Sequence, residues 1–328
     1  MRRPSAPWCW ASIALLLAGC ASSQKDRPPT IRTEEVSRPP ATPTVLQGER
    51  LLSEGKPREA LRTFQQAVAD DPKDARAWLD LGLASEEVGD ASAAEQAYRR
   101  AVDIDPGFPD PLNNLGVLLR EAGKLDQAID MLERAAAIDP ALVAARFNLA
   151  LAYEDQGRLE EAEREYRAVI ARLPNDPVPR INLAMMLLEM GRAEAAAEEL
   201  RVASSMVRRD VLLSIAVGEG LRRAGLPEEA VPVLRNALEI ATEPPPTELL
   251  AELALAHYAT GDLESADAAM RRALRQDELD PALQYAYGSI LAKRGDLGRA
   301  RVHLRRAIEL DPDGPYAARA RARLETIK

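Results

Sequence analysis

A 34-residue period runs through this sequence and constrains its fold more than any other feature. Two residue types keep this spacing together, in the series Gly55, Gly89, Gly123, Gly157, Gly191 and Gly225 and the series Ala60, Ala94, Ala128, Ala162, Ala196 and Ala230. After one step of 36 residues both series resume, with Gly261 and Ala266 and then Gly295 and Ala300. A period of this length is typical of stacked helix–turn–helix units, so it predicts an all-α solenoid.

Residues 75–108 show what one unit contains. The expected first helix carries Trp78, Leu81 and Gly82 and ends at Gly89, because a residue without Cβ suits a left-handed turn after a helix. The expected second helix carries small and aromatic residues and stops at a proline: Ala94, Tyr98, Ala101, Ile104 and Asp105-Pro106. The small residues allow two antiparallel helices to cross at about 8–10 Å.

The unit resembles the tetratricopeptide repeat (TPR) family, which has Trp, Leu-Gly, Ala, Tyr or Phe, Ala and Pro at this spacing. The resemblance implies an all-α fold, a right-handed TPR superhelix (α-solenoid) of about eight helix-turn-helix repeats with a C-terminal capping helix. The expected repeats are 41–74, 75–108, 109–142, 143–176, 177–210, 211–246, 247–280 and 281–314, which together make up 41–314.

Two places and one end depart from the regular repeat. Arg208 replaces the final proline of the fifth repeat, and the sixth repeat ends in Pro244-Pro245-Pro246 with two extra residues, so we expect a bend or loosening over 204–246. Residues 315–328 are too short for another helix pair. Four apolar residues there share one face, Tyr316, Ala320, Leu324 and Ile327, which predicts a capping helix over the open end.

Residues 1–19 are expected to be a lipoprotein signal peptide and not part of the fold. Arg2 and Arg3 precede an apolar run from Trp8 to Ala18, which is shorter than the ~20 residues of a membrane span. The run ends in Leu17-Ala18-Gly19-Cys20, which resembles the lipobox of bacterial lipoproteins. In that family the cysteine becomes the first mature residue and is acylated, so the resemblance implies lipidation (palmitate or similar chains) of Cys20. Ordinary secretion is the alternative.

The residues after Cys20 are expected to form a disordered tether over 20–40, because they combine Pro28, Pro29, Pro39 and Pro40 with polar residues. Ala21 follows the cysteine, where an Asp favours inner-membrane retention in Gram-negative lipoproteins. The resemblance therefore implies a protein held to the outer membrane by acyl chains on Cys20 and facing the periplasm.

Composition argues against several classes of function. The chain has 43 Lys and Arg against 52 Asp and Glu, a net charge of −9, and 4% aromatic residues, so we expect no nucleic-acid partner. With only His257, His303, Cys9 and Cys20, no His/Cys metal cluster can be built. We expect His257 to pack between helices and His303 to lie on the surface. We expect no catalytic residue, no metal, no cofactor and no enzymatic activity, because no acids, bases or nucleophiles converge.

One column of polar residues stands out from the scaffold. Asn114, Asn148 and Asn182 are 34 residues apart, so they stack in three successive first helices. In the TPR family this position, its preceding neighbour and the residue three further on line the concave groove. The resemblance therefore implies that partners bind at Leu79, Leu83, Asn113, Asn114, Val117, Phe147, Asn148, Leu151, Ile181, Asn182 and Met185.

Two roles for the asparagines remain open. Their amides can hold the backbone of an extended peptide while apolar neighbours contact its side chains, or they can bridge adjacent repeats. The Lys position of the carboxylate clamp in chaperone-binding TPR domains holds Leu79, Asn113, Phe147 and Ile181 here, so an acidic C-terminus is not the expected ligand.

The expected function is that of a membrane-anchored scaffold which binds protein partners in its groove. Lipid-anchored TPR proteins of this build resemble the pilotins of type IV pili, so assembly of a pilus secretin, with secretin subunits as partners, is the preferred hypothesis. The alternative is an adaptor lipoprotein for peptidoglycan hydrolases, outer-membrane protein assembly or exopolysaccharide export.

Overall fold

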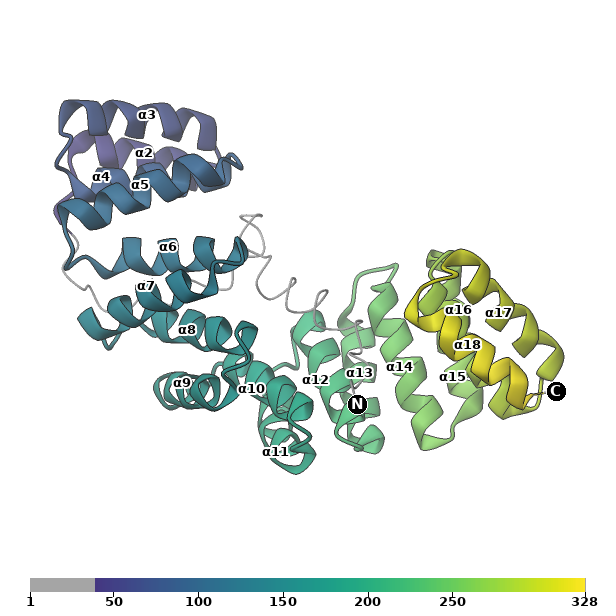
Figure 1. Ribbon diagram of the computed structural model, residues 1–328. Coiled ribbons are helices and arrows are strands. Elements are labelled where there is room, and N and C mark those ends of the chain that lie inside the picture. Colours follow the sequence, from purple (N-terminus) through teal and green to yellow (C-terminus); the bar gives the residue numbers. More distant parts are fainter. Residues whose placement is uncertain (1–38, 328) are drawn as a thin grey trace. The chain divides into compact units, whose positions relative to one another are not determined.

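The computed structural model describes residues 39–327, and Figure 1 shows its helices. These residues form seventeen α-helices and no β-strand, so the all-α solenoid predicted from the period is confirmed. They divide into two compact units, which we call the N-terminal unit (residues 39–173) and the C-terminal unit (residues 174–327). The expected signal peptide, Cys20 and most of the expected tether lie outside the described residues.

The N-terminal unit consists of four antiparallel helix pairs. In each pair a first helix of 11 or 13 residues precedes a second helix of 14 residues. The pairs are α2 (Pro43–Ser53) with α3 (Pro57–Asp70), α4 (Ala75–Glu87) with α5 (Ala91–Ile104), α6 (Pro109–Glu121) with α7 (Leu125–Ile138), and α8 (Val143–Asp155) with α9 (Leu159–Arg172).

The C-terminal unit consists of four further pairs and one terminal helix. The pairs are α10 (Pro177–Glu189) with α11 (Ala193–Ser204), α12 (Val211–Arg223) with α13 (Pro227–Ile240), α14 (Thr247–Thr260) with α15 (Leu263–Gln276), and α16 (Pro281–Arg294) with α17 (Leu297–Leu310). The terminal helix α18 (Pro315–Thr326) packs on α16 and α17 and buries Ala317 and Ala320. Among residues 39–327 no helix combines the length and the apolar character that crossing a membrane requires.

A glycine ends the first helix of each pair. All eight of these glycines have positive φ, between +71° and +88°, which side chains with a Cβ rarely adopt. The backbone N–H of Gly89, for example, donates to the Glu86 carbonyl, and the next residue donates to the Ser85 carbonyl. The 34-residue spacing of these glycines is therefore the spacing of the turns inside the helix pairs.

A second set of glycines and alanines lies where the two helices of a pair cross. A Cβ at Gly82 would lie 2.3 Å from Cε1 of Tyr98, and a Cβ at Gly116 would lie 2.5 Å from Cγ of Leu132. Tyr98 and Leu132 are completely buried, so neither side chain can turn outward. The large residue of the second helix thus fills the space that the small residue of the first helix leaves.

We predict that Gly82→Ala lowers the free energy of unfolding by ~1–3 kcal/mol, because overpacking forces a buried ring out of position. Denaturant unfolding of the full chain measures this change. The matched control is Gly298→Ala in α17, where a Cβ would meet nothing within 4 Å and stability should not fall. Equal losses in the two variants would show that crowding at the helix crossing is not the cause.

Two hydrogen bonds tie the irregular segment over 204–246 to its neighbours. Val207 is 1% exposed, and its carbonyl accepts a 2.9 Å hydrogen bond from the Ser214 hydroxyl. The carbonyl of Pro245 accepts a 3.1 Å hydrogen bond from the Gln276 side chain. The boundary between the two units falls instead between Leu173 and Pro174, where the repeat shows no irregularity.

Candidate functional site

Half-buried side chains of three successive first helices form a candidate surface in the N-terminal unit. We call it the first-helix face and define it as Leu83 of α4, Asn113, Asn114 and Val117 of α6, and Phe147, Asn148 and Leu151 of α8. α6 packs directly against α8. The Phe147 ring meets the buried Tyr166 ring edge-on, with centroids 5.9 Å apart, so one side of Phe147 is fixed by the core.

The asparagines of this face form a chain of amide hydrogen bonds. Nδ2 of Asn148 donates to Oδ1 of Asn113 at 2.9 Å, which links α8 to α6. Nδ2 of Asn113 donates in turn to Oδ1 of Asn114 at 3.1 Å. The amides therefore bridge adjacent repeats, the alternative left open by the sequence, although the bridge joins residues 35 apart and not the expected 34. Because each amide carries two N–H donors, this chain leaves donors over for a ligand.

Three residues expected to contact a ligand belong to the core. Leu79 is 3% exposed, Ile181 is completely buried and Met185 is 5% exposed. Their positions in the first helix face the neighbouring helices and leave no accessible side chain, so we remove them from the expected contacts. Asn182 is half-buried in α10 and, like Ile181 and Met185, belongs to the C-terminal unit.

Sequence reasoning missed a row of carboxylates beside the first-helix face. Glu87, Glu121 and Asp155 are the last residues of α4, α6 and α8 and are 34 residues apart, so the period itself was the available signal. Each lies at the negative end of its helix dipole, where a carboxylate is unfavourable. The side chain of Asp155 is 49% exposed and pairs with Arg120 at 3.3 Å, but its partial burial outweighs this contact and raises the pKa of its carboxyl.

Buried tyrosines connect the two helices within a repeat. The Tyr166 hydroxyl of α9 donates to Oε2 of Glu154 in α8 at 2.6 Å, and the Tyr98 hydroxyl of α5 donates to Glu86 in α4. Burial raises the pKa of both tyrosines far above the usual value, and the neighbouring glutamates raise it further. The hydroxyls therefore remain protonated donors, which anchors the ends of these first helices to the core.

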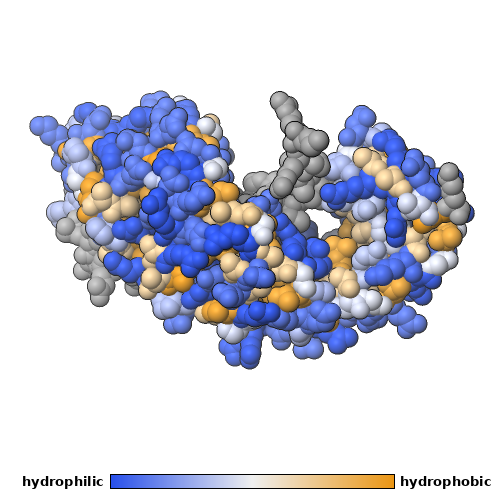
Figure 2. All heavy atoms as spheres, turned by 60° about the horizontal axis from the view of Figure 1, so that its bottom comes forward, coloured by the Kyte–Doolittle hydropathy of each residue, from blue (hydrophilic) through white to orange (hydrophobic). Residues whose placement is uncertain are grey.

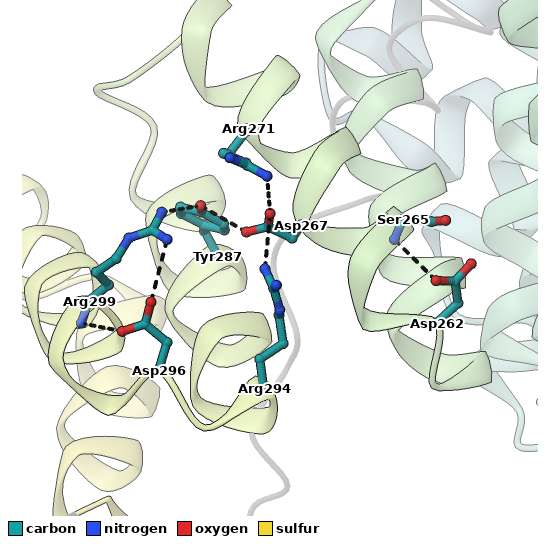
Figure 3. A network of polar contacts seen from close by, with 8 residues as sticks. All are labelled: Asp262, Ser265, Asp267, Arg271, Tyr287, Arg294, Asp296 and Arg299. Carbon is teal, nitrogen blue, oxygen red and sulfur yellow. Dashed lines mark hydrogen bonds and ion pairs between the residues drawn. The ribbon is translucent and has the colours of Figure 1, made fainter.

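Figure 3 shows a polar network in the C-terminal unit that joins α15, α16 and α17. Asp267 of α15 is 2% exposed, accepts a 3.0 Å hydrogen bond from the Tyr287 hydroxyl, and pairs with Arg271 and, at 3.0 Å, with Arg294. Nη2 of Arg299 donates to the same hydroxyl at 2.6 Å. Every group in this network bonds to another, so its geometry fits a structural role.

The first helices of the C-terminal unit carry charges that are already paired. Arg222 of α12 holds Glu252 of α14 with two hydrogen bonds of 2.9 and 3.2 Å, and Arg223 pairs with Glu189 of α10 at 2.6 Å. Burial raises the pKa of Glu252, while the guanidinium of Arg222 opposes that shift. These pairs hold neighbouring repeats together, as Arg120 and Asp155 do in the N-terminal unit.

Both histidines serve packing. His257 is 5% exposed, as its expected place between helices requires, and burial lowers its pKa. His303 was expected on the surface but is half-buried, because its ring packs edge-on against Tyr287 and its Nδ1 lies 2.7 Å from Oε1 of Gln284. Within residues 39–327, no group of three or more His, Cys, Asp and Glu could hold a metal ion.

The repeated helix pairs define a helical-repeat scaffold of the kind that typically binds proteins and performs no catalysis. Two family models described as tetratricopeptide repeat match the chain, one at residues 45–109 and 251–315 and the other at 85–141, 119–178 and 155–211. Together they span well over half of the sequence. The chain therefore belongs to the tetratricopeptide-repeat family, as its residues suggested.

Solved structures show the same fold at low identity. The structure of the APC/C hetero-tetramer Cut9–Hcn1 is 19% identical to this chain, with a TM-score of 0.56. The match covers 87% of this chain and 55% of the Cut9–Hcn1 chain, so this chain spans about half the length of that relative. A TPR protein from Parabacteroides merdae ATCC 43184 is 16% identical, with a TM-score of 0.56, and the match covers 77% of this chain and 98% of that protein's chain. PilW, described as a type IV pilus biogenesis factor, is 20% identical, with a TM-score of 0.56, and the match covers 63% of this chain and 94% of the PilW chain. None of the curated proteins matches the sequence.

Proposed function

We propose that the first-helix face binds an extended segment of a partner protein, and that the chain is a scaffold held at a membrane. The observation that carries the first part is the composition of the face. Leu83, Val117 and Leu151 remain partly exposed at one register of three successive helices, next to amides with donors to spare. An extended peptide presents side chains and backbone groups alternately, so such a face can contact both.

The carboxylate row indicates which charge the partner carries. Asn114 and Glu121 lie seven residues apart on α6, which is about two turns, so the row runs along the same side of the helices as the amides. A basic side chain of the partner would offset the unfavourable helix-end position of Glu121 in this row. An acidic C-terminus would meet like charges there.

The membrane part of the proposal rests on Cys20 and its lipobox, with the outer membrane and its periplasmic face as the expected location. Assembly of a type IV pilus secretin remains the preferred process, and PilW supports it only by sharing the fold. An adaptor for peptidoglycan hydrolases, outer-membrane protein assembly or exopolysaccharide export is the second candidate, because the same face would serve any extended partner segment.

Co-purification of the full chain from membranes in mild detergent tests the face. In the double variant Val117→Glu, Leu151→Glu, recovery of the partner should fall at least about tenfold, because each buried charge costs more than 1.4 kcal/mol of binding. The matched control is Ile138→Glu, Val202→Glu, whose side chains are 41% and 42% exposed and outside the face.

The identity of the recovered partner decides between the two processes. Secretin subunits would support the first, and peptidoglycan hydrolases would support the second. If the face variant keeps its helicity and recovers its partner as the wild-type chain does, the first-helix face is not the binding site.

A further inference from the structure

The C-terminal end of this acidic chain is basic. Residues 293–327 contain nine Lys and Arg and five Asp and Glu, whereas the whole chain has 43 against 52. Most of the nine lie on α17 and α18, which lie side by side at the end of the solenoid in Figure 1 and pack against each other. We call five of them the basic end: Arg301, Arg305, Arg306, Arg319 and Arg321.

Backbone carbonyls hold two arginines of the basic end. In other second helices some exposed arginines pair with carboxylates, as in Arg99 with Glu95, Arg167 with Glu163 and Arg201 with Glu229, whereas others, such as Arg62 and Arg100, are exposed without such a pair. In the basic end Arg301 donates to the carbonyl of Ile327 and Arg321 to the carbonyl of Pro312, both at 2.8 Å.

The positive charges of the other arginines in the basic end also have few carboxylates close to them. The guanidinium of Arg319 lies over the Tyr316 ring, 5.5 Å from its centroid, and only Arg306 pairs with a carboxylate, at 3.3 Å from Glu309. Carbonyls and a ring orient the arginines without cancelling their charge. The remaining nearby acids are Asp296, which pairs with Arg299, and Asp311, Asp313 and Glu325.

The surface around these arginines lacks the apolar anchor of a protein interface. No large hydrophobic residue of α18 is among the exposed ones, and α17 exposes only Val302, at 64%. Protein interfaces concentrate their binding energy in buried aromatic and aliphatic side chains, whereas a charged lipid surface needs no matching shape. Figure 2 shows hydrophilic and hydrophobic residues interspersed over the face of the molecule that it presents.

We propose that the basic end binds the phosphate head groups of anionic phospholipids. A guanidinium is preorganised for phosphate and always charged, and each one near an anionic bilayer contributes about 1 kcal/mol of attraction. The acidic remainder of the chain does not cancel this attraction, because charges more than about 10 Å away are screened at physiological salt. The contact depends neither on acyl chains at Cys20 nor on the first-helix face.

Arginine footprinting of the full chain with phenylglyoxal tests this contact. With vesicles containing 30% phosphatidylglycerol, Arg305, Arg319 and Arg321 should be modified several-fold more slowly than with pure phosphatidylcholine. Arg99, Arg167 and Arg201 are internal controls, with side chains 46%, 54% and 50% exposed, and their rates should not change. The protection should disappear in 0.5 M salt.

Matched variants supply the second measurement. Arg305→Gln, Arg319→Gln, Arg321→Gln should lose about a hundredfold of its preference for anionic over neutral vesicles, relative to Arg99→Gln, Arg167→Gln, Arg201→Gln. Equal labelling rates on the two vesicle types, or equal losses in the two triple variants, would overturn the proposal. Protection by polyglutamate but not by vesicles would also overturn it and would point to an acidic protein partner.

Discussion

Replacing Asp267 by alanine should lower the free energy of unfolding of the last repeats by about 3 kcal/mol or more. Removing one member of a buried ion pair leaves the others without a partner, and such changes cost ~3–5 kcal/mol. Here Arg294 loses a contact of 3.0 Å, and the Tyr287 hydroxyl loses its acceptor. Arg271 is 52% exposed and can turn to water, which places the loss at the lower end of that range.

Hydrogen exchange of the full chain measures where that stability is lost. Exchange should accelerate in α15, α16 and α17 and change little in α4 to α7, because damage in a repeat array spreads mainly to neighbours. Glu309→Ala is the control, since it breaks an ion pair with side chains 46% and 62% exposed and should cost less than about 1 kcal/mol. Equal effects of the two variants would show that burial of Asp267 does not matter.

Replacing Cys20 by serine should remove the protein from the membrane fraction almost completely. Two or more acyl chains give stable anchoring, and a serine hydroxyl is a much poorer nucleophile than a thiolate for receiving them. The expected result is an uncleaved precursor or a released protein, detected by its size and by fractionation into inner membrane, outer membrane and soluble fractions.

Cys9→Ser is the matched control for this prediction, because Cys9 is the only other cysteine and lies within the expected signal peptide. That variant should be processed and anchored as the wild-type chain is. If Cys20→Ser runs at mature size in the outer membrane, Cys20 is not the anchor. Loss of anchoring leaves the folded repeats intact, so thermal unfolding of α2 to α18 should be unchanged.

The period alone was enough to predict the fold, because local rules repeat in every unit. A turn with positive φ needs a glycine, and a close helix crossing needs a small residue opposite a large one, as at Gly82 and Tyr98. Each repeat therefore carries the same glycine and small residue at the same position, and this produces the period in the sequence. The boundary between the two units after Leu173 does not coincide with any change in this pattern. The pattern is interrupted instead near Val207 and Pro245, whose carbonyls accept hydrogen bonds from Ser214 and Gln276.

The candidate site could be predicted only in part. The 34-residue spacing correctly placed Asn114 and Asn148 at one register, but register does not reveal burial, so Ile181 was expected to be accessible and is not. The amide bridge joins Asn148 to Asn113, which are 35 residues apart, and not to Asn114, which is 34 residues away. The register of Asp267 holds Glu95 and Glu163 in two other repeats, each paired with an arginine four residues further on, so the period does indicate its pair with Arg271. Its contacts with Tyr287 and Arg294 come from the next repeat and have no repeated counterpart in the sequence.

The connectivity of the helices has a mechanical consequence. Substantial packing in the described residues joins only helices that are neighbours or next neighbours along the chain, so no distant segment locks a helix pair in place. Under a pulling force, an array of this kind would therefore unfold one helix pair at a time. Each released repeat of 34 residues could extend by roughly 100 Å. The chain would then lengthen in steps while the remaining repeats keep their shape.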